Sequence, residues 1–270
     1  MIGLSTYSFF WQHSSEAPEP LTLADMLRRT RDADVDLFQI CDYLPLLAYS
    51  AAELGDIRSL ANDLGLTLEL GTRGVQVEHL ATFAGLAESL GASLVRSMVN
   101  TADHQPSMTE AEELLRVALP AYERAGLTLA LETYEQVASA DLVSLVESVG
   151  SDALGICLDP ANSVAALELP KDVVERTAPY VRNIHVKDFA FSRRGGWVGF
   201  TLEGVELGTG LLDYDHLLST VQPEARGINQ VIEHWLTWRG TYEETAALEN
   251  LWNSRNIAYL TSHQARSTES

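Results

Sequence analysis

Segments typical of buried β-strands alternate with amphipathic helical segments along almost the whole chain, and this alternation restricts the fold more than any other feature. The predicted strands are short apolar runs, as in parallel strands that are covered on both faces. Eight strand–helix pairs without a glycine-rich phosphate-binding turn after the first strand predict a closed (β/α)8 TIM barrel rather than an open doubly wound sheet. We place the strands at residues 2–7, 36–41, 66–70, 93–99, 127–132, 154–158, 181–186 and 229–233.

The length of 270 residues fits one such barrel. We expect residues 1–260 to form a single barrel domain and the polar residues 261–270 to form a C-terminal tail. Two long segments, 8–20 and 187–212, interrupt the regular alternation. Long loops in a compact domain commonly carry function, so we expect both to border the active site.

The formal net charge of −20 disfavours binding to nucleic acid or to an anionic membrane, because both depend on Lys and Arg side chains. The apolar runs are also too short to cross a membrane. A strand-like run begins at Ile2, and no pattern typical of a secretory signal precedes it. We therefore expect a cytoplasmic enzyme that acts on a small neutral or weakly charged molecule.

Each of the last four predicted strands ends on a residue that can bind a metal. A carboxylate that ends a buried apolar strand must be paired or coordinated, and carboxylates that converge on an imidazole repel one another unless a cation lies between them. A salt bridge explains any single member equally well, whereas the set favours one divalent ion. Three oxygen donors and one imidazole suit Mn²⁺ best, with Mg²⁺, Co²⁺ or Zn²⁺ as alternatives. The four predicted ligands are Glu132, Asp159, His185 and Glu233.

These strand ends, with the motifs Leu-Asp159-Pro-Ala-Asn162 and Ile-His185-Val-Lys187-Asp around two of them, resemble the xylose isomerase-like TIM barrel superfamily. Within it the chain resembles the sugar phosphate isomerase/epimerase branch, from the first strand to the eighth helix. The resemblance implies a metal-dependent isomerase or epimerase of a sugar or keto-polyol. It also implies a homo-oligomer, and a catalytic subunit that needs a separate partner chain would share these features.

The resemblance further implies that Glu132 and Glu233 are catalytic. One glutamate removes a proton next to a metal-bound carbonyl, the reaction passes through an enediolate, and the other glutamate can return a proton. Which of the two is the base stays open.

One departure from the family pattern favours a second hypothesis. Ketose 3-epimerases usually carry a His at the position of Asn162, and an amide cannot carry a proton charge. The alternative is a lyase that uses the same site, namely an inosose dehydratase or a deglycosidase that eliminates the β-substituent of a 3-keto-glycoside. An apurinic endonuclease is disfavoured, because it needs extra His ligands and a basic surface, whereas this chain has seven His and a charge of −20.

Several residues near the strand ends are candidates for substrate binding. Lys187 lies two residues beyond His185 and points to the same side of an extended strand, although an ion pair with a carboxylate explains it equally well. Arg96 has the same two interpretations. Aromatic or imidazole side chains in the first long loop can approach the mouth of the barrel or pack the loop down. The candidates are Asn162, Lys187, Arg96, Trp11 and His13.

Overall fold

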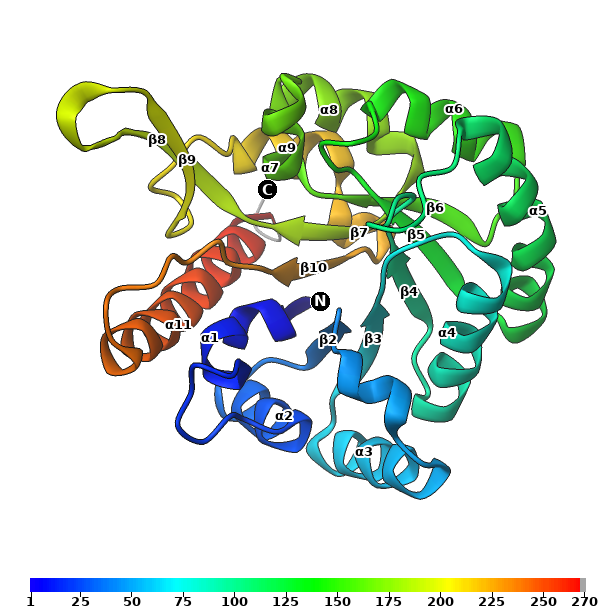
Figure 1. The fold of residues 1–270 in the computed structure, drawn as a ribbon, viewed down its shortest axis with the longest axis horizontal. Coiled ribbons are helices and arrows are strands. Elements are labelled where there is room, and N and C mark those ends of the chain that lie inside the picture. The colour runs from blue at the N-terminus through cyan, green and yellow to red at the C-terminus, as the bar shows by residue number, and fades with distance from the viewer. Residues whose placement is uncertain (268–270) are drawn as a thin grey trace.

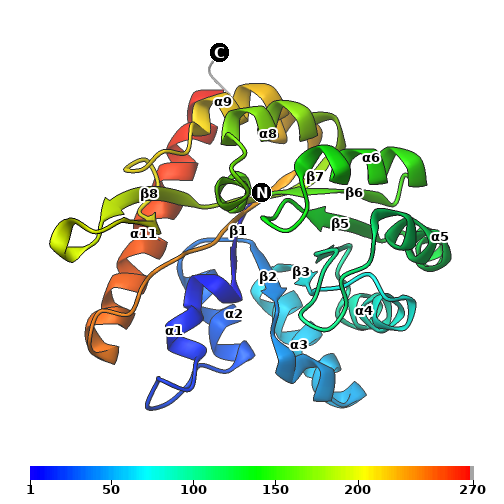
Figure 2. The same ribbon diagram turned by 45° about the horizontal axis from the view of Figure 1, so that its top comes forward.

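The computed structural model describes residues 1–267, and eight parallel strands in it close into a barrel in the order β1-β10-β7-β6-β5-β4-β3-β2 (Figures 1 and 2). The predicted (β/α)8 barrel is thereby confirmed. The barrel closes because β1 pairs in parallel with both β10 and β2. Its strands are β1 (Ile2–Ser5), β2 (Leu37–Cys41), β3 (Thr67–Gly71), β4 (Leu94–Ser97), β5 (Thr128–Glu132), β6 (Leu154–Leu158), β7 (Val181–Val186) and β10 (Asn229–Ile232).

Helices surround the barrel and cover the outer face of its strands (Figure 2). The α-helices are α1 (Phe10–His13), α2 (Leu23–Asp32), α3 (Ala51–Leu64), α4 (Val77–Leu90), α5 (Met108–Ala125), α6 (Ser139–Val149), α7 (Pro160–Ser163), α8 (Pro170–Thr177), α9 (Tyr214–Val221), α10 (Pro223–Arg226) and α11 (Tyr242–Ser267). Short 3₁₀ helices are η1 (Thr6–Phe9), η2 (Leu44–Ala48), η3 (Val164–Ala166), η4 (Ala178–Tyr180) and η5 (Gly195–Trp197).

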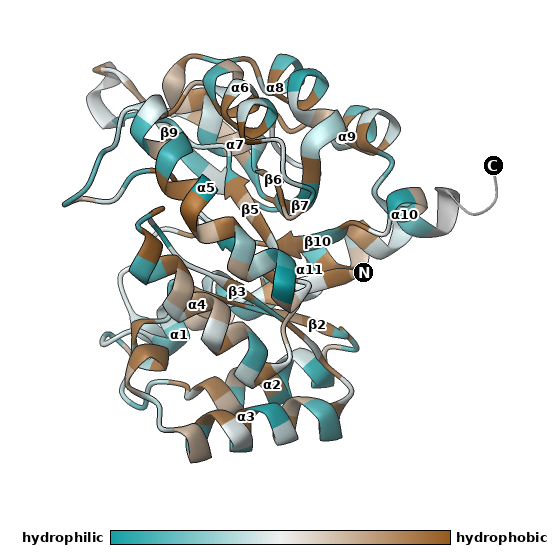
Figure 3. Cartoon of the chain, turned by 90° about the vertical axis from the view of Figure 1, so that its right-hand side faces the viewer, coloured by the Kyte–Doolittle hydropathy of each residue, from teal (hydrophilic) through white to brown (hydrophobic). Residues whose placement is uncertain are grey.

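The core lies between strands and helices. Every residue of β2 and of β6 is buried, as expected for parallel strands that have side chains packed on both faces. Figure 3 shows the strands largely in the hydrophobic colour, while the surrounding helices alternate between hydrophobic and hydrophilic residues. Within the described residues, no helix is long and apolar enough to cross a membrane.

The C-terminal segment differs from the prediction. Residues 261–267 continue α11, so the polar composition of this part of the predicted tail does not end the helix, and residues 268–270 lie outside the described residues. Leu260 is fully buried, and the His263 ring packs against Tyr214 at 5.3 Å between ring centroids. These two buried side chains tie this part of the helix to the barrel, a signal too sparse to see in the composition.

The first long segment also contains more structure than predicted, because η1 and α1 occupy residues 6–13. In the second, β8 (Asp188–Arg193) and β9 (Phe200–Val205) form an antiparallel hairpin that projects from the barrel (Figure 1). The hairpin is inserted between β7 and β10, so the eighth strand of the barrel is β10.

Asp188 fixes the base of this hairpin. Its buried carboxylate accepts hydrogen bonds from the backbone N–H groups of Phe189, Gly208, Gly210 and Leu212, at 2.8–3.0 Å. A side chain at Gly210 would collide with Asp188 and with the Phe189 carbonyl, so the turn requires glycine there. The motif His-Val-Lys-Asp thus supplies both a strand end and the anchor of the next loop.

Replacing Asp188 with alanine leaves four N–H groups, which are buried or partly buried, without their acceptor, so we expect Asp188→Ala to lower the free energy of unfolding by about 3 kcal/mol. Urea denaturation followed by circular dichroism measures the change. The matched control is Asp152→Ala in an exposed turn, which should change stability by less than about 0.5 kcal/mol. Equal stability of the two variants would contradict the anchoring role.

Candidate metal centre

The four predicted ligands come together at the carboxyl ends of four adjacent barrel strands. Glu132 is the last residue of β5, Asp159 follows β6, His185 lies near the end of β7, and Glu233 follows β10. All four are at most 4% exposed. Each offers one ligand atom, and these atoms lie within 4.8 Å of one another. The sequence prediction that these four residues form one cluster is confirmed.

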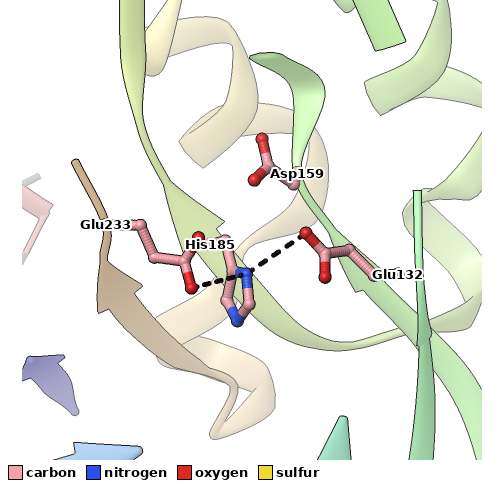
Figure 4. A group of neighbouring side chains, drawn as sticks. All are labelled: Glu132, Asp159, His185 and Glu233. Carbon is pink, nitrogen blue, oxygen red and sulfur yellow. Dashed lines mark ion pairs between the residues drawn. The ribbon is translucent and has the colours of Figure 1, made fainter. Parts of the chain in front are cut away.

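His185 lies at the centre of the cluster, with Glu132 and Glu233 approaching it from opposite sides (Figure 4). Its Nδ1 is 3.5 Å from Glu132 Oε1 and 3.4 Å from Glu233 Oε1. Its Nε2 is 2.8 Å from Gln39 Oε1. Because an amide oxygen only accepts, Nε2 carries a proton, and in the neutral ring the lone pair of Nδ1 faces the two carboxylates.

Gln39 is itself fixed by a buried polar layer below the cluster. Its Nε2 donates to Glu69 Oε2 and to Asn183 Oδ1, both at 3.2 Å. Glu69 also accepts from Asn183 and from Asn229, at 2.9 and 2.7 Å. This layer leaves only the Oε1 atom of Gln39 to face His185, and so sets the orientation of the imidazole.

Asp159 owes its position to the Asp-Pro-Ala-Asn motif. Its Oδ1 caps α7 by accepting hydrogen bonds from the backbone N–H groups of Ala161 and Asn162, at 3.1 and 3.3 Å. Its Oδ2 lies 2.8 Å from the Nζ of Lys187. Burial raises the pKa of Asp159, and the Lys187 ammonium only partly offsets this effect.

Glu132 has both oxygens engaged. Oε1 accepts a 2.7 Å hydrogen bond from Asn162 Nδ2, and Oε2 pairs with the Arg96 guanidinium. Burial alone would raise the pKa of Glu132, but Arg96 and His185 hold it well below its usual value. Glu132 is therefore an ionised, tightly positioned carboxylate.

These features fit a divalent cation. His185 Nδ1 and Glu233 Oε1 are buried and have no hydrogen-bond partner, which is costly for polar atoms unless they bind an ion. Separations of 3.4–3.5 Å between the facing atoms suit neighbouring ligands of one ion, for which ligand distances of about 2.1 Å are usual. The buried cluster of two glutamates, one aspartate and one histidine is thus suited to one divalent metal.

A cavity of about 210 Å³ opens beside the cluster. Three predicted substrate-binding residues, Arg96, Asn162 and Lys187, line it. Sequence reasoning did not select several further lining residues; most of them follow a barrel strand, but a position after a strand does not by itself show which side chains face the cavity. They are Tyr7, Arg73, Met98, Tyr134, Glu135 and Trp235.

Trp11 and His13 do not line this cavity. The indole of Trp11 donates a 2.7 Å hydrogen bond to the Leu236 carbonyl and packs against Trp238, while the His13 ring packs against Tyr43. The first segment is held in place by the fully buried Glu249 of α11, which accepts hydrogen bonds from the backbone N–H groups of residues 11 and 12. Trp11 and His13 therefore pack the first segment against neighbouring parts of the protein.

Replacing Gln39 with methionine removes the acceptor that orients His185, so we expect Gln39→Met to weaken binding of Mn²⁺ about 10- to 100-fold. Isothermal titration calorimetry of the metal-free protein measures the change. Gln76→Met, at an exposed position, is the matched control and should leave the affinity unchanged. An unaltered affinity in Gln39→Met would show that the buried layer does not position the imidazole.

Glu249 predicts a pH dependence of stability. Burial raises its pKa to about 7, against the hydrogen bonds that lower it. The folded state therefore binds this proton more tightly than the unfolded state does, and the associated stability is lost as the pH rises from about 4.5 through 7. We expect the free energy of unfolding of the wild type to fall by about 3 kcal/mol relative to Glu249→Gln over this range. Parallel curves from urea denaturation at pH 4.5 to 7.5 would contradict this.

Comparison with known proteins agrees with this fold and site. The family model described as xylose isomerase-like TIM barrel matches residues 27–251. The chain is 52% identical over 259 residues to the 3-oxo-isoapionate decarboxylase of Pectobacterium atrosepticum, covering 96% of this chain and 94% of that protein.

Two solved structures share the fold at low sequence identity. A xylose isomerase-like TIM barrel protein from Mycobacterium smegmatis, in complex with magnesium, superposes with a TM-score of 0.71 at 19% identity and covers 95% of this chain and 97% of its own. D-psicose 3-epimerase from Clostridium cellulolyticum H10, with D-tagatose, gives 0.73 at 13% identity over 97% and 98%. The family match and the decarboxylase together show that this chain belongs to the xylose isomerase-like TIM barrel family.

Proposed function

We propose that this protein is a metal-dependent carbon–carbon lyase that decarboxylates a small 3-oxo sugar acid. The observation that carries the proposal is the 52% identity to 3-oxo-isoapionate decarboxylase over nearly the full length of both chains. Of the two hypotheses from the sequence, this supports the lyase over the isomerase or epimerase. The bond that breaks is carbon–carbon, however, and not the carbon–oxygen bond expected from the dehydratase and deglycosidase alternatives. The resemblance to D-psicose 3-epimerase, at 13% identity, concerns the fold alone.

The chemistry is close to that expected for an isomerase. In a 3-oxo acid the bond between C1 and C2 breaks, C1 leaves as CO₂, and the electron pair passes through C2 towards the ketone oxygen at C3. A proton then adds to C2 and gives a ketone one carbon shorter. A bound divalent ion supplies Lewis-acid stabilisation for the negative charge on the ketone oxygen.

The engagement of Glu132 suits decarboxylation. Both oxygens of Glu132 are bound by Arg96 and Asn162, so this glutamate is not free to take a proton from carbon as the base of an isomerase does. Decarboxylation removes CO₂ in place of that proton, so no base is required. In this proposal Glu132 is a fixed ligand of the metal.

Lys187 is the cation placed to act on the reacting atoms. Its Nζ lies 2.8 Å from Asp159 and 3.2 Å from Glu233, over the ring of Trp235 at 4.6 Å from the ring centroid. Burial lowers the pKa of Lys187, but the nearby carboxylates of Asp159 and Glu233 raise it by more, so the net pKa is above its usual value and the amine is charged. An ammonium held in a buried site stabilises developing oxyanion charge.

The proposal predicts release of labelled CO₂. The protein is loaded with Mn²⁺ and incubated with 3-oxo aldonates labelled with ¹³C at C1, generated in place, and products are followed by NMR and mass spectrometry. We expect metal-dependent ¹³CO₂ formation above the spontaneous rate, and a rate lower by about 100-fold or more in Glu233→Gln. Chelated wild-type protein is the matched control. A product of unchanged mass would support an isomerase instead, and loss of water would support a dehydratase.

A further inference from the structure

One cationic side chain that lines the cavity beside the metal centre is exposed to solvent. Three of the cavity's lining residues are cationic, and two of them are enclosed, since the side chains of Arg96 and Lys187 are only 4% and 5% exposed. Arg73, which follows β3, is different, because 53% of its side chain is exposed. Of the three, it is the cation that an incoming ligand reaches first.

Arg73 is nevertheless held in a defined orientation. Its Nε donates to Asp42 Oδ2 at 3.0 Å, and its Nη2 donates to the hydroxyl oxygen of Tyr7 at 2.9 Å. The Tyr7 hydroxyl in turn donates to Asp42 at 2.8 Å. Within residues 1–267 the Nη1 atom has no hydrogen-bond partner. One edge of the guanidinium is thus fixed by the protein, while N–H groups of the other remain for a ligand.

The Asp42 residue that holds Arg73 has an unusual backbone conformation. Its backbone has φ = 50°, in the left-handed region that residues other than glycine rarely adopt and that Asp tolerates better than most. The Asp42 carboxylate pairs with both arginines, since its Oδ1 atom also lies 3.4 Å from Arg96 Nη1. Unusual backbone geometry of this kind is concentrated at functional sites.

The charges of the cavity allow an anion to bind. With a divalent ion bound, the ion and the three cationic side chains exceed the four carboxylates of Asp42, Glu132, Asp159 and Glu233 by one positive charge. The remaining lining carboxylate, Glu135, is exposed at the rim. With Glu135 counted the charges balance, so an anion meets no net repulsion in the cavity, whereas the protein as a whole, with a net charge of −20, repels anions.

We propose that Arg73 binds the carboxylate of the substrate and makes the site selective for sugar acids over neutral sugars. The inference rests on the proposed decarboxylation and names the group that recognises the departing carboxylate. Arginine suits this role because its planar guanidinium matches a carboxylate. Lys187 is less suited, because its Nζ is already engaged by Asp159, Glu233 and Asn162.

The position of Arg73 also determines which kinetic constant it governs. Negative charge leaves the carboxylate as CO₂ forms, so an ion pair with Arg73 is stronger in the bound substrate than in the transition state. Such an interaction lowers KM without raising kcat. We therefore expect Arg73→Gln to raise KM for a 3-oxo aldonate about 10- to 100-fold, with kcat unchanged or slightly increased. Arg73→Lys, which keeps the charge without the planar fork, should be intermediate.

A binding experiment tests the subsite without turnover. The Mn²⁺-loaded protein is titrated calorimetrically with 3,4-dihydroxybutanoate and with 1,2,4-butanetriol, which has a hydroxymethyl group in place of the carboxylate. We expect the wild type to bind the acid at least about tenfold more tightly than the triol, and Arg73→Gln to lose this preference. The matched control is Arg28→Gln, which removes an equally exposed arginine paired with Asp25 on α2 and should keep the preference.

The outcomes separate the two proposals. If Arg73→Gln, or Arg73→Lys where the first variant does not fold, keeps the full preference for the acid, Arg73 is not the carboxylate subsite. A wild-type protein without any preference would overturn the subsite in the same way. If the preference depends on Arg73 but no 3-oxo aldonate releases CO₂, the subsite stands and decarboxylation fails. If CO₂ is released and KM does not change in Arg73→Gln, decarboxylation stands and the subsite fails.

Discussion

The structure depends on keeping three carboxylates and an imidazole together in a buried site. Like charges at these separations repel strongly in a medium of low dielectric constant, and the chain limits this cost by engaging the carboxylates with its own donors. Asp159 caps a helix with one oxygen, and Glu132 is bound by Asn162 and Arg96. What remains unsatisfied is a set of inward-facing atoms, His185 Nδ1 and Glu233 Oε1 among them, that is suited to a divalent ion.

The interior of the barrel serves this centre. Side chains inside a TIM barrel are usually branched and apolar, whereas a layer of glutamine, asparagine and glutamate lies beneath His185 in this chain. A buried polar layer stabilises the fold only if its members are satisfied, and these amides and carboxylates bond one another. This polar layer replaces apolar packing inside the barrel and fixes the orientation of the His185 imidazole, as expected where function constrains the core.

The same arrangement explains why isomerase and lyase are hard to distinguish in this family. Both reactions place negative charge on a carbon next to a ketone, so both use a metal and nearby cations to stabilise the resulting oxyanion. They differ in whether a proton or CO₂ leaves. In our proposal the difference lies in side chains around the metal centre, namely the arginine that engages Glu132 and the exposed guanidinium of Arg73.

The sequence by itself determined the barrel and the four residues of the candidate metal centre. Strand and helix periodicity is a local property, and a charged residue at the end of an apolar strand is visible without knowing its neighbours. Glu132, Asp159, His185 and Glu233 could therefore be identified together, because parallel strands bring their ends to one face. The hairpin and the continuation of α11 to Ser267 were less visible, since each depends on a few buried contacts.

Only the tertiary structure decided which other side chains share the cavity. Trp11 and His13 belong to the first segment, but Glu249, more than 230 residues away in the chain, holds that segment against α11. Arg73 was not among the predicted substrate-binding residues, because its orientation depends on Asp42 and Tyr7 from two other strand ends. Such contacts between distant residues leave no periodic pattern in the sequence, and their chemistry is fixed only when the barrel closes.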